Sequence, residues 1–253
     1  VDSNFEVLQK YKKKFSGVML YDNVEEAIKN SSYCGFVVST PAKTHYEIAK
    51  KVILSSNHVL VEKPLTLNIE DAEELVHLSK KYKVNLMVGH LLLFHPAINK
   101  IKEFIDNGRI GKLQYMYSNR LNLGQVRSEE NVFWSFAPHD ISIFQYFNEC
   151  FPSKISAKGS SFLQKGIHDS TITQLAYPNG VNGHIFVNWL HPFKEHRIVI
   201  IGSKGMLTYE DSSKEKYLKY YNKKFNLSNM VPTKIDGPIE NVNYEKKMPL
   251  EQQ

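Results

Sequence analysis

The sequence has few cysteines, no long apolar run and no GxGxxG phosphate-binding loop. None of its apolar stretches approaches the roughly 20 residues that a membrane helix needs, and no secretory signal opens the chain. The two cysteines, Cys34 and Cys150, have no CxxC spacing, which argues against a disulfide framework or a zinc site. We therefore expect a cytoplasmic protein with both cysteines in its core.

The charge of the chain is modestly positive, with a net value of +6. Its lysines are spread over predicted helix faces and are densest between Lys214 and Lys224, and no nucleic-acid-binding signature accompanies them. We predict no nucleic-acid partner and no membrane partner, but a surface suited to an anionic small molecule. No histidine and carboxylate pair has metal-ligand spacing, so we predict no metal.

Strands and helices alternate in the first part of the chain. Asn4, Asn23 and Asn68 each precede a helical pattern as capping residues. In the helix after Asn68 we expect the face that packs on the sheet to contain Ile69, Ala72, Leu75, Val76 and Ser79. The predicted strands cover residues 35–39, 58–61 and 84–88, the first of them buried on both faces. This order predicts right-handed βαβ units and a doubly wound parallel sheet.

The second part of the chain reads mainly as long strands. We predict a helix that begins at Pro96, a strand over 113–122, and a helix over 138–147 whose first turn carries His139 and Asp140. Further strands are predicted over 170–177, 182–190, 197–201 and 206–209, with a hairpin at Pro178-Asn179-Gly180. Residues 212–241 look like a surface excursion or a poorly ordered segment. The second part is therefore an α+β domain with a large, mostly antiparallel open sheet.

Lys63 is the strongest candidate for chemistry. It follows the apolar strand 58–61, and open α/β sheets bind their ligands at the carboxyl ends of their strands. Pro64 restricts the backbone of Lys63 and helps to aim its ammonium group, which could hydrogen-bond a substrate hydroxyl and help to move a proton. The alternative is a surface lysine paired with Glu62.

His139 and Asp2 are further candidates. A histidine in the first turn of a helix would be kept neutral by the positive end of the dipole and could accept a proton, although it could equally be a buried structural donor. Asp2 follows a strand-like residue, where an acid can bind the ribose hydroxyls of NAD, or it can simply cap a helix. His45, His90 and His95 lie near strand ends and could line the same cleft, but a satisfied structural histidine is the simpler account of each.

Several ordered motifs resemble one known family. Val37-Val38-Ser39-Thr40-Pro41 with His45, Val61-Glu62-Lys63-Pro64, and Val88-Gly89 with Phe94-His95-Pro96 are similar to motifs of the Gfo/Idh/MocA oxidoreductases. The later motifs resemble the branch that oxidises the 3-hydroxyl of UDP-N-acetylglucosamine-type sugars. They are 118–124, Glu129-Glu130-Asn131, 134–141 and 189–194.

The resemblance implies hydride transfer with NAD, and less favourably NADP. It implies that Thr40, Pro41, His45 and Glu62 lie along the dinucleotide and that Lys63 contacts the reacting hydroxyl. His139 would then be the base. The substrate contacts that we expect are Arg120, Asn122, Ser135 and Asp140.

The chain also departs from the family pattern. The first strand and glycine loop of relatives have no counterpart before Val1, Ser135 stands where many relatives have an aspartate, and Leu91-Leu92-Leu93 replaces a segment that often holds an arginine. We therefore expect a chain truncated at both ends, with a partial Rossmann domain over 1–92 and a substrate and oligomerisation domain over 93–253. A dimer or tetramer is expected through the open sheet. Two other readings are a dehydrogenase of a free sugar or cyclitol and a non-catalytic relic of the family.

Overall fold

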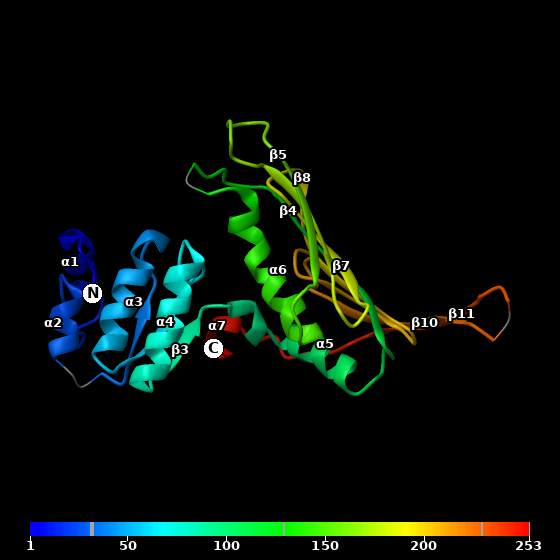
Figure 1. Ribbon diagram of the computed structural model, residues 1–253, viewed down its shortest axis with the longest axis horizontal. Helices are drawn as coiled ribbons and strands as arrows, with labels where there is room; N and C mark the ends of the chain where they lie inside the picture. The colour runs from blue at the N-terminus through cyan, green and yellow to red at the C-terminus, as the bar shows by residue number, and fades with distance from the viewer. Residues whose placement is uncertain (31–32, 129, 229, 253) are drawn as a thin grey trace. The chain divides into compact units, whose positions relative to one another are not determined.

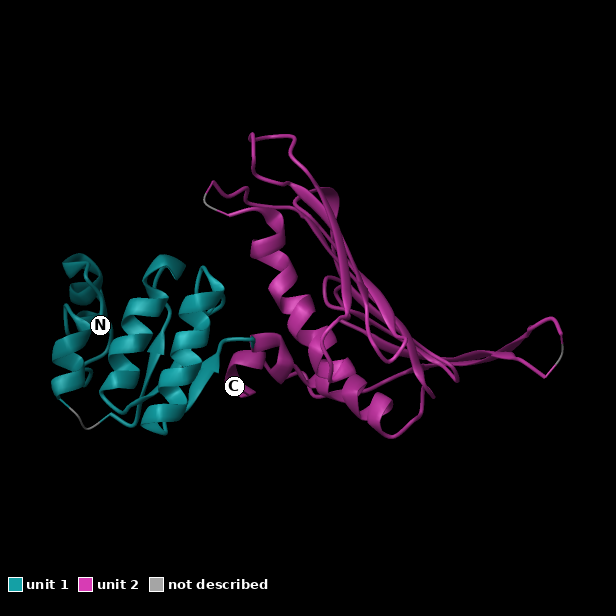
Figure 2. Cartoon of the chain, in the orientation of Figure 1, with its two compact units in different colours: residues 1–90 teal, residues 91–253 magenta. Residues whose placement is uncertain are grey.

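The computed structural model describes residues 1–30, 33–128, 130–228 and 230–252. Glu129, part of a motif quoted above, lies outside the described residues. The chain divides into two compact units, Val1–His90 and Leu91–Gln253 (Figures 1 and 2). The sequence predicts this boundary two residues later, after residue 92.

The first unit is a three-stranded parallel sheet with helices packed on it. The strands follow the order β1-β2-β3, and Val38 pairs with Val61, which pairs with Val88. Apolar side chains of α3 and α4 pack on the buried residues of β1 and β2 to form the core. The elements are α1 (Phe5–Lys14), α2 (Val24–Lys29), β1 (Gly35–Val38), η1 (Ala42–Thr44), α3 (His45–Leu54), β2 (His58–Val61), α4 (Ile69–Tyr82) and β3 (Leu86–Val88).

Asparagine side chains cap three helices of this unit, as the sequence predicts. Asn4 Oδ1 accepts the N–H of Glu6 at 2.9 Å, Asn23 Oδ1 that of Glu26 at 2.9 Å, and Asn68 Oδ1 that of Asp71 at 2.8 Å. Each cap satisfies a backbone donor that a helix start leaves free, and such a cap contributes about 1 kcal/mol.

Three predictions for this unit are wrong. Strand β1 is not buried on both faces, because it lies at the edge of the sheet and Val37 is 71% exposed. On α4 the buried residues are Leu75, Leu78 and Ser79, whereas Ile69 is 72% exposed and Val76 41% exposed. The face that packs on the sheet is therefore rotated relative to the predicted one. Cys34 is exposed because it precedes β1, outside the core, whereas Cys150 packs against the core of the second unit.

The second unit is an eight-stranded sheet with α5 and α6 on one face (Figure 1). The strand order is β11-β10-β9-β8-β4-β7-β6-β5. Its core contains Trp189, Phe144 and Met116, which are fully buried between the sheet and the helices. The elements are η2 (Leu91–Phe94), α5 (Pro96–Asp106), β4 (Leu113–Leu123), α6 (Val132–Asn148), β5 (Lys154–Ser160), β6 (Ser170–Ala176), β7 (Asn182–Asn188), β8 (Leu190–Gly202), β9 (Met206–Glu210), β10 (Leu218–Asn226), β11 (Thr233–Asn241) and α7 (Pro249–Gln252).

Strand β4 is the centre of this sheet. It pairs with β8 in the antiparallel sense and with β7 in the parallel sense, with Arg120 opposite both His196 and Val187. The predicted hairpin joins β6 and β7, and Gly180 adopts a φ of +86° that a residue without Cβ accepts readily. The third strand of the prediction begins earlier than expected, at Leu190 rather than Arg197.

Two predictions for the second unit are wrong. Helix α6 begins at Val132, well before Pro138, because Asn131 caps it by accepting the N–H of Trp134 at 3.1 Å. His139 therefore lies near the middle of α6, where the effect of the helix dipole that the sequence predicted does not reach it. Residues 212–241 are no loose excursion either, since Leu218 and Tyr220 of β10 are buried and β10 and β11 extend the sheet. Within the described residues, no helix has the length and apolar character needed to cross a membrane.

Candidate functional site

The carboxyl ends of the three parallel strands bring together the motifs of the first unit. Thr40 follows β1, Glu62 and Lys63 follow β2, and Gly89 and His90 follow β3. The Glu62 N–H donates to Val38 O at 2.8 Å, and the Gly89 N–H donates to Val61 O at 2.7 Å. The pairing thus continues past the strands and fixes these motifs side by side at one edge of the sheet, where such sheets bind ligands.

His45 braces two of these strand ends. It is 1% exposed, at the first residue of α3, and its ring nitrogens lie 2.7 Å from Thr40 O and 2.8 Å from Pro64 O. Each ring nitrogen faces a backbone carbonyl, and the nitrogen that carries the proton donates to its carbonyl. His45 positions the Thr40-Pro41 and Lys63-Pro64 segments, which is the structural role that the sequence left open for it.

Glu62 lies directly against Gly89. A Cβ at position 89 would stand 3.0 Å from the carboxyl carbon of Glu62, so a side chain there would press on this carboxylate. The Glu62 carboxylate also accepts the Lys63 N–H at 3.3 Å, and the Lys63-Pro64 peptide is cis. A negative charge and the base of the Lys63 side chain are thus held beside the end of β3.

His90 is a residue whose role the sequence did not reveal. Burial lowers its pKa, while the Glu62 carboxylate nearby raises it in part. Its Nδ1 atom is buried and has no hydrogen-bond partner among the described residues. A buried polar atom without a partner is unusual, so this nitrogen is a candidate ligand contact. The available signal was its position directly after the strand-ending Gly89.

The remaining predicted cofactor residues make local contacts. Asp2 Oδ1 accepts the Asn4 N–H at 2.8 Å, which ties the residues just before α1 together. Thr40 Oγ1 accepts the Thr44 hydroxyl at 2.7 Å, and Thr44 Oγ1 also donates to Pro41 O at 2.8 Å. The turn after β1 is therefore held from within, and Thr40 itself remains exposed at the strand end.

Helix α6 carries three of the predicted residues of the second unit. Ser135 is 8% exposed, and Asp140 is 1% exposed on the side of the helix that faces the sheet. Asp140 forms two hydrogen bonds with Arg120 of β4, at 2.9 Å from Nε and 3.0 Å from a terminal nitrogen. Two residues expected at the substrate are thus paired with each other.

Asn122, unlike the paired Arg120, has a buried side-chain oxygen available to a ligand. Its Oδ1 is buried without a hydrogen-bond partner among the described residues, near the end of β4. A Cβ on Gly124 would stand 2.5 Å from this oxygen, so the glycine leaves room for the amide. Asn122 therefore offers an acceptor that a substrate hydroxyl or amide N–H could satisfy.

Asp169 organises the segments around the start of α6, and the sequence analysis did not single it out. It is fully buried and accepts the Phe162 and Leu163 N–H groups at 2.6 and 2.9 Å and Trp189 Nε1 at 2.5 Å. Burial opposes its charge, but these donors hold its pKa below the ordinary value. The missed signal was an acid at the head of a strand that otherwise alternates apolar residues.

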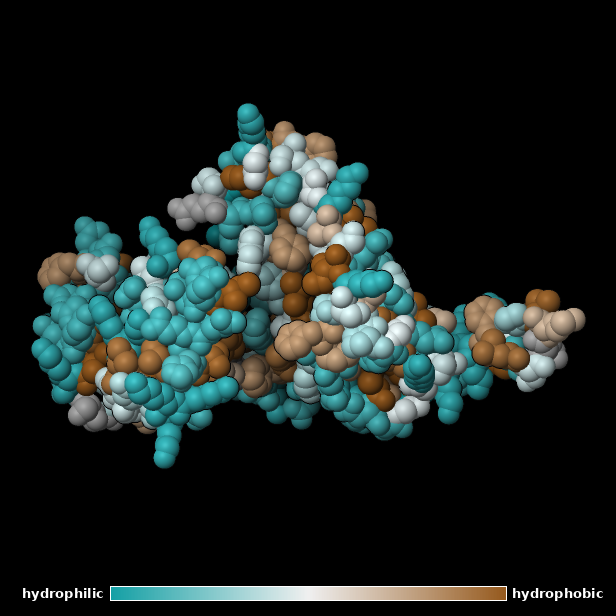
Figure 3. Space-filling view, viewed as in Figure 1, coloured by the Kyte–Doolittle hydropathy of each residue, from teal (hydrophilic) through white to brown (hydrophobic). Residues whose placement is uncertain are grey.

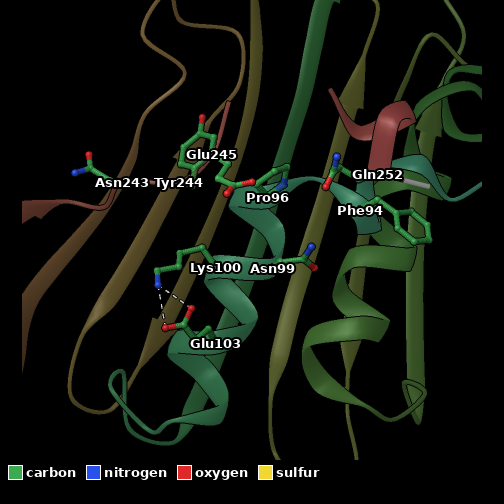
Figure 4. Close-up of a pocket in the computed structure, with 9 residues that line it drawn as sticks. All are labelled: Phe94, Pro96, Asn99, Lys100, Glu103, Asn243, Tyr244, Glu245 and Gln252. Carbon is green, nitrogen blue, oxygen red and sulfur yellow. Dashed lines mark hydrogen bonds and ion pairs between the residues drawn. The ribbon is translucent and has the colours of Figure 1, made fainter. Parts of the chain in front are cut away.

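The second unit also has an open cavity of about 690 Å³ on the outer side of α5 (Figure 4). The lining contains a paired Lys100 and Glu103 and the aromatic rings of Phe94 and Tyr244. None of its lining side chains coincides with a residue that the sequence had predicted for the site. All of its lining residues belong to the second unit.

The sequence matches one protein family over both units. Residues 1–90 match the oxidoreductase family with an NAD-binding Rossmann fold, and residues 98–208 match the GFO/IDH/MocA C-terminal domain. The chain belongs to the Gfo/Idh/MocA oxidoreductase family. The predicted fold class, a Rossmann-type parallel sheet followed by a large, mostly antiparallel sheet domain, is confirmed, as is the prediction of an NAD-binding domain.

The similar proteins are named for different substrates. The myo-inositol 2-dehydrogenase of Thermotoga maritima is 26% identical over 211 residues, which cover 79% of this chain and 63% of that protein. The structure of the UDP-N-acetylglucosamine 3-dehydrogenase GnnA from Acidithiobacillus ferrooxidans is similar with a TM-score of 0.81 and 19% identity, covering 96% of this chain and 74% of that one. The WlbA dehydrogenase from Bordetella pertussis, in complex with NADH and UDP-GlcNAcA, gives a TM-score of 0.74 at 21% identity over 83% of this chain and 64% of that one. The chain spans about half the length of two further curated relatives, 54% and 56%.

Proposed function

We propose that the protein to which this chain belongs transfers a hydride between NAD and the 3-hydroxyl of a UDP-N-acetylated sugar. The observation that carries this proposal is the strand-end site of the first unit. There Thr40, Glu62, Lys63 and His90 gather at one edge of a parallel sheet, and His45 braces two of the three segments. Such edges are where dinucleotides bind in doubly wound sheets.

The residues at this edge of the sheet suit the ribose and carboxamide of the dinucleotide better than its pyrophosphate. The unpartnered Nδ1 of His90 and the exposed Thr40 supply polar atoms of the kind that hold a ribose or a carboxamide. The sequence contains no GxGxxG, so the residues present offer no glycine cradle for a pyrophosphate. The bound nicotinamide supplies the hydride chemistry, and the protein supplies orientation and proton handling.

We assign the proton handling to Lys63 and His139. An ammonium group at Lys63 can donate a hydrogen bond to the reacting hydroxyl and stabilise the oxygen as its proton leaves. His139 is the residue proposed to accept that proton, a role that suits the range in which imidazole titrates. Asn122 Oδ1, buried without a partner among the described residues, is proposed to accept a hydrogen bond from the sugar.

The substrate class has two candidates. The likeness to solved structures named as UDP-N-acetylglucosamine 3-dehydrogenase and WlbA supports a nucleotide sugar. The sequence relatives named myo-inositol 2-dehydrogenase and scyllo-inositol 2-dehydrogenase support a free cyclitol instead. We favour the nucleotide sugar because the motifs of the second unit resemble that branch. The expected homo-oligomer stays a prediction.

Ligand-dependent stabilisation tests both the cofactor and the substrate. A ligand that binds the folded state raises the melting temperature, and at one hundred times its Kd it contributes about 2.7 kcal/mol. We expect a shift with NADH, and a larger one when UDP-N-acetylglucosamine is added than when myo-inositol or glucose is added. A shift with inositol alone would favour the cyclitol enzyme. Absence of any shift, with no NADH turnover by the full-length protein, would leave the non-catalytic relic as the better account.

Replacing Lys63 with methionine in the full-length protein tests the catalytic assignment. The long apolar side chain is kept and the charge is lost, so kcat should fall by at least about 100-fold while NADH still binds. Unchanged turnover would remove Lys63 from the mechanism.

A further inference from the structure

The buried Arg120–Asp140 pair joins the central strand of the eight-stranded sheet to the turn of α6 that carries His139. We propose that this pair is a positioning device that sets the direction of the His139 side chain, and that it does not bind a substrate anion. The predicted effect on turnover rests on the proposed function. The contacts that support the inference all lie within the second unit.

The pair has the geometry of a fixed, two-point connection. Arg120 Nε and a terminal nitrogen donate to the two carboxylate oxygens of Asp140 at 2.9 and 3.0 Å. The side chains are 11% and 1% exposed. Parallel bonds of this kind fix orientation as well as distance. A bidentate pair specifies this orientation more narrowly than a contact between two apolar side chains of similar size.

The rotation of α6 about its own axis determines where His139 points. Consecutive residues of an α-helix are about 100° apart around the axis, since 3.6 residues make one turn. Because Asp140 is held to β4 from inside the unit, the neighbouring His139 must point away at a fixed angle. The pair therefore sets the direction of the proposed base without touching it.

Pro138 makes such a connection useful at this turn. It lies inside α6 immediately before His139. Proline has no N–H, so the helix loses one of its own hydrogen bonds there, and its ring disturbs the preceding turn. The Ser142 hydroxyl donates to His139 O at 2.8 Å, which adds a second local connection. The turn that carries His139 is thus intrinsically weakened and is held by side chains instead.

The cavity beside Arg120 is too small for a substrate anion. Arg120 lines a cavity of about 10 Å³ together with His196, Tyr209 and Asp211. That volume holds roughly one water molecule and cannot hold a carboxylate or a diphosphate. Burial, reinforced by the positive charge of Arg120, lowers the pKa of His196 to about 4, so the histidine stays neutral next to the guanidinium. Arg120 is therefore satisfied from within its own unit.

The test compares three variants of the full-length protein. In Asp140→Asn and Arg120→Met we expect kcat to fall about 10- to 100-fold, the size of effect that a displacement of about 1 Å can have, with the KM for the sugar changed less than about 3-fold. Arg120→Lys keeps the charge but loses the two-point geometry, so it should recover only part of kcat.

Lys102→Met is the matched control. Lys102 is a similarly buried cation, with a side chain 10% exposed, and it pairs with Asp106 and with Glu149 at the far end of α6. Its loss should lower the melting temperature less, because its carboxylate partners are 56% and 73% exposed, and leave kcat within about 2-fold of the parent. If Lys102→Met lowers kcat as much as Asp140→Asn does, the effect is one of general stability and the proposal fails.

An activity-independent readout separates this inference from the proposed function. The readout is the NMR signal of the His139 ring in protein with isotope-labelled histidine, assigned with a His139→Gln variant. This signal should shift or broaden in Asp140→Asn and remain in place in Lys102→Met. Unchanged ring signals in Asp140→Asn would overturn the inference. So would a KM raised more than 10-fold with unaltered kcat in Arg120→Met, because that pattern belongs to a substrate contact. A parent protein without NADH turnover would sink the proposed function, while the ring signals would still decide the positioning role.

Discussion

Single side chains decide how the strand ends of the first unit are held. The Lys63 position followed from the sequence, because a polar residue after an apolar strand and before proline has few other places to go. The role of His45 did not, because its two partners are backbone carbonyls of segments that are distant in the sequence. Arg120 and Asp140 were likewise each expected at the substrate, and only the fold shows that they pair with each other. Side chains that bind one another across the fold leave no local pattern.

Gly89→Ala should show how tightly Glu62 is packed. The new Cβ would stand 3.0 Å from the Glu62 carboxyl carbon, so either the carboxylate or the end of β3 must move. We expect a loss of about 1–3 kcal/mol in the free energy of unfolding, measured by denaturant titration, and weaker NADH binding. Gly17→Ala is the control, because a Cβ there meets nothing within 4 Å. Equal stability of the two variants would contradict this packing argument.

His45→Ala should loosen the same edge by another route. It removes the ring that contacts both Thr40 O and Pro64 O, and the hydrogen bond that this ring donates to one of them contributes about 1 kcal/mol. We expect a lower melting temperature and a higher Kd for NADH, from thermal unfolding and fluorescence titration. His77→Ala, on the exposed side of α4, should change neither quantity.

Helices and strands were predictable where a local signal marks their ends. The asparagine caps and the Pro178-Asn179-Gly180 hairpin are of this kind. The start of α6 was missed because Pro138 looked like a first residue, although the capping Asn131 was present in the sequence. Strands β10 and β11 were missed because lysine and asparagine interrupt the apolar residues of β10, and because β11 contains Gly237 and Pro238, which strand interiors disfavour. There the sheet supplies the pairing that the sequence pattern only weakly indicates.

The outer part of the β10–β11 hairpin is the element least tied to the rest of its unit. Strand β10 pairs with β9 over Leu218–Tyr221, and among the described residues from Lys223 to Asp236 the two arms of the hairpin pair only with each other. Its end exposes large apolar side chains, seen as the brown residues at the right of Figure 3. They are Phe225, Leu227, Met230 and Val231.

Replacing residues 223–236 with a two-residue Asn-Gly turn should therefore cost little. A two-stranded hairpin is at best marginally stable by itself, so we expect the melting temperature to move by less than about 3 °C. Solubility should increase, because an exposed apolar patch is removed. Leu218→Asn, which places an amide in the core, should in contrast destabilise by about 2–4 kcal/mol. Unfolding of the variant with the shortened hairpin would show that the outer part of the hairpin has a structural role.

The chain as a whole should lose stability in mild acid. Burial lowers the pKa of His90, His95 and His184, and burial together with Arg120 lowers that of His196 from 6.5 to about 4. These groups stay neutral in the folded state while the unfolded chain takes up protons. The free energy of unfolding is therefore highest above pH 6.5 and falls as the pH drops toward 4, by roughly 2–3 kcal/mol from His196 alone.

Thermal unfolding between pH 7.5 and 4.5 measures this dependence. A His196→Gln variant should show a flatter profile than the parent, because the group that titrates differently in the two states is gone. Parallel profiles for the two proteins would exclude His196 as a source of the acid sensitivity.

The division of the whole chain into two units was visible in the sequence as a change from alternating helices and strands to long strands. What the sequence does not show is the order of the strands in the larger sheet. Strand β4 lies between β7 and β8, so residues 115–121 pair with 182–188 on one side and with residues of the strand 190–202 on the other. Neither contact can be read from neighbouring residues.

This arrangement of β4 also determines the order in which the second unit can form. During synthesis β4 emerges before α6, β5 and β6, and it has no strand to pair with until β7 has left the ribosome. Contacts between residues so far apart in the chain carry a large loop-closure entropy and make folding slow. Until then both edges of β4 lack a partner strand and its apolar face is uncovered. A chain stalled before residue 182 should therefore aggregate more readily than the completed chain.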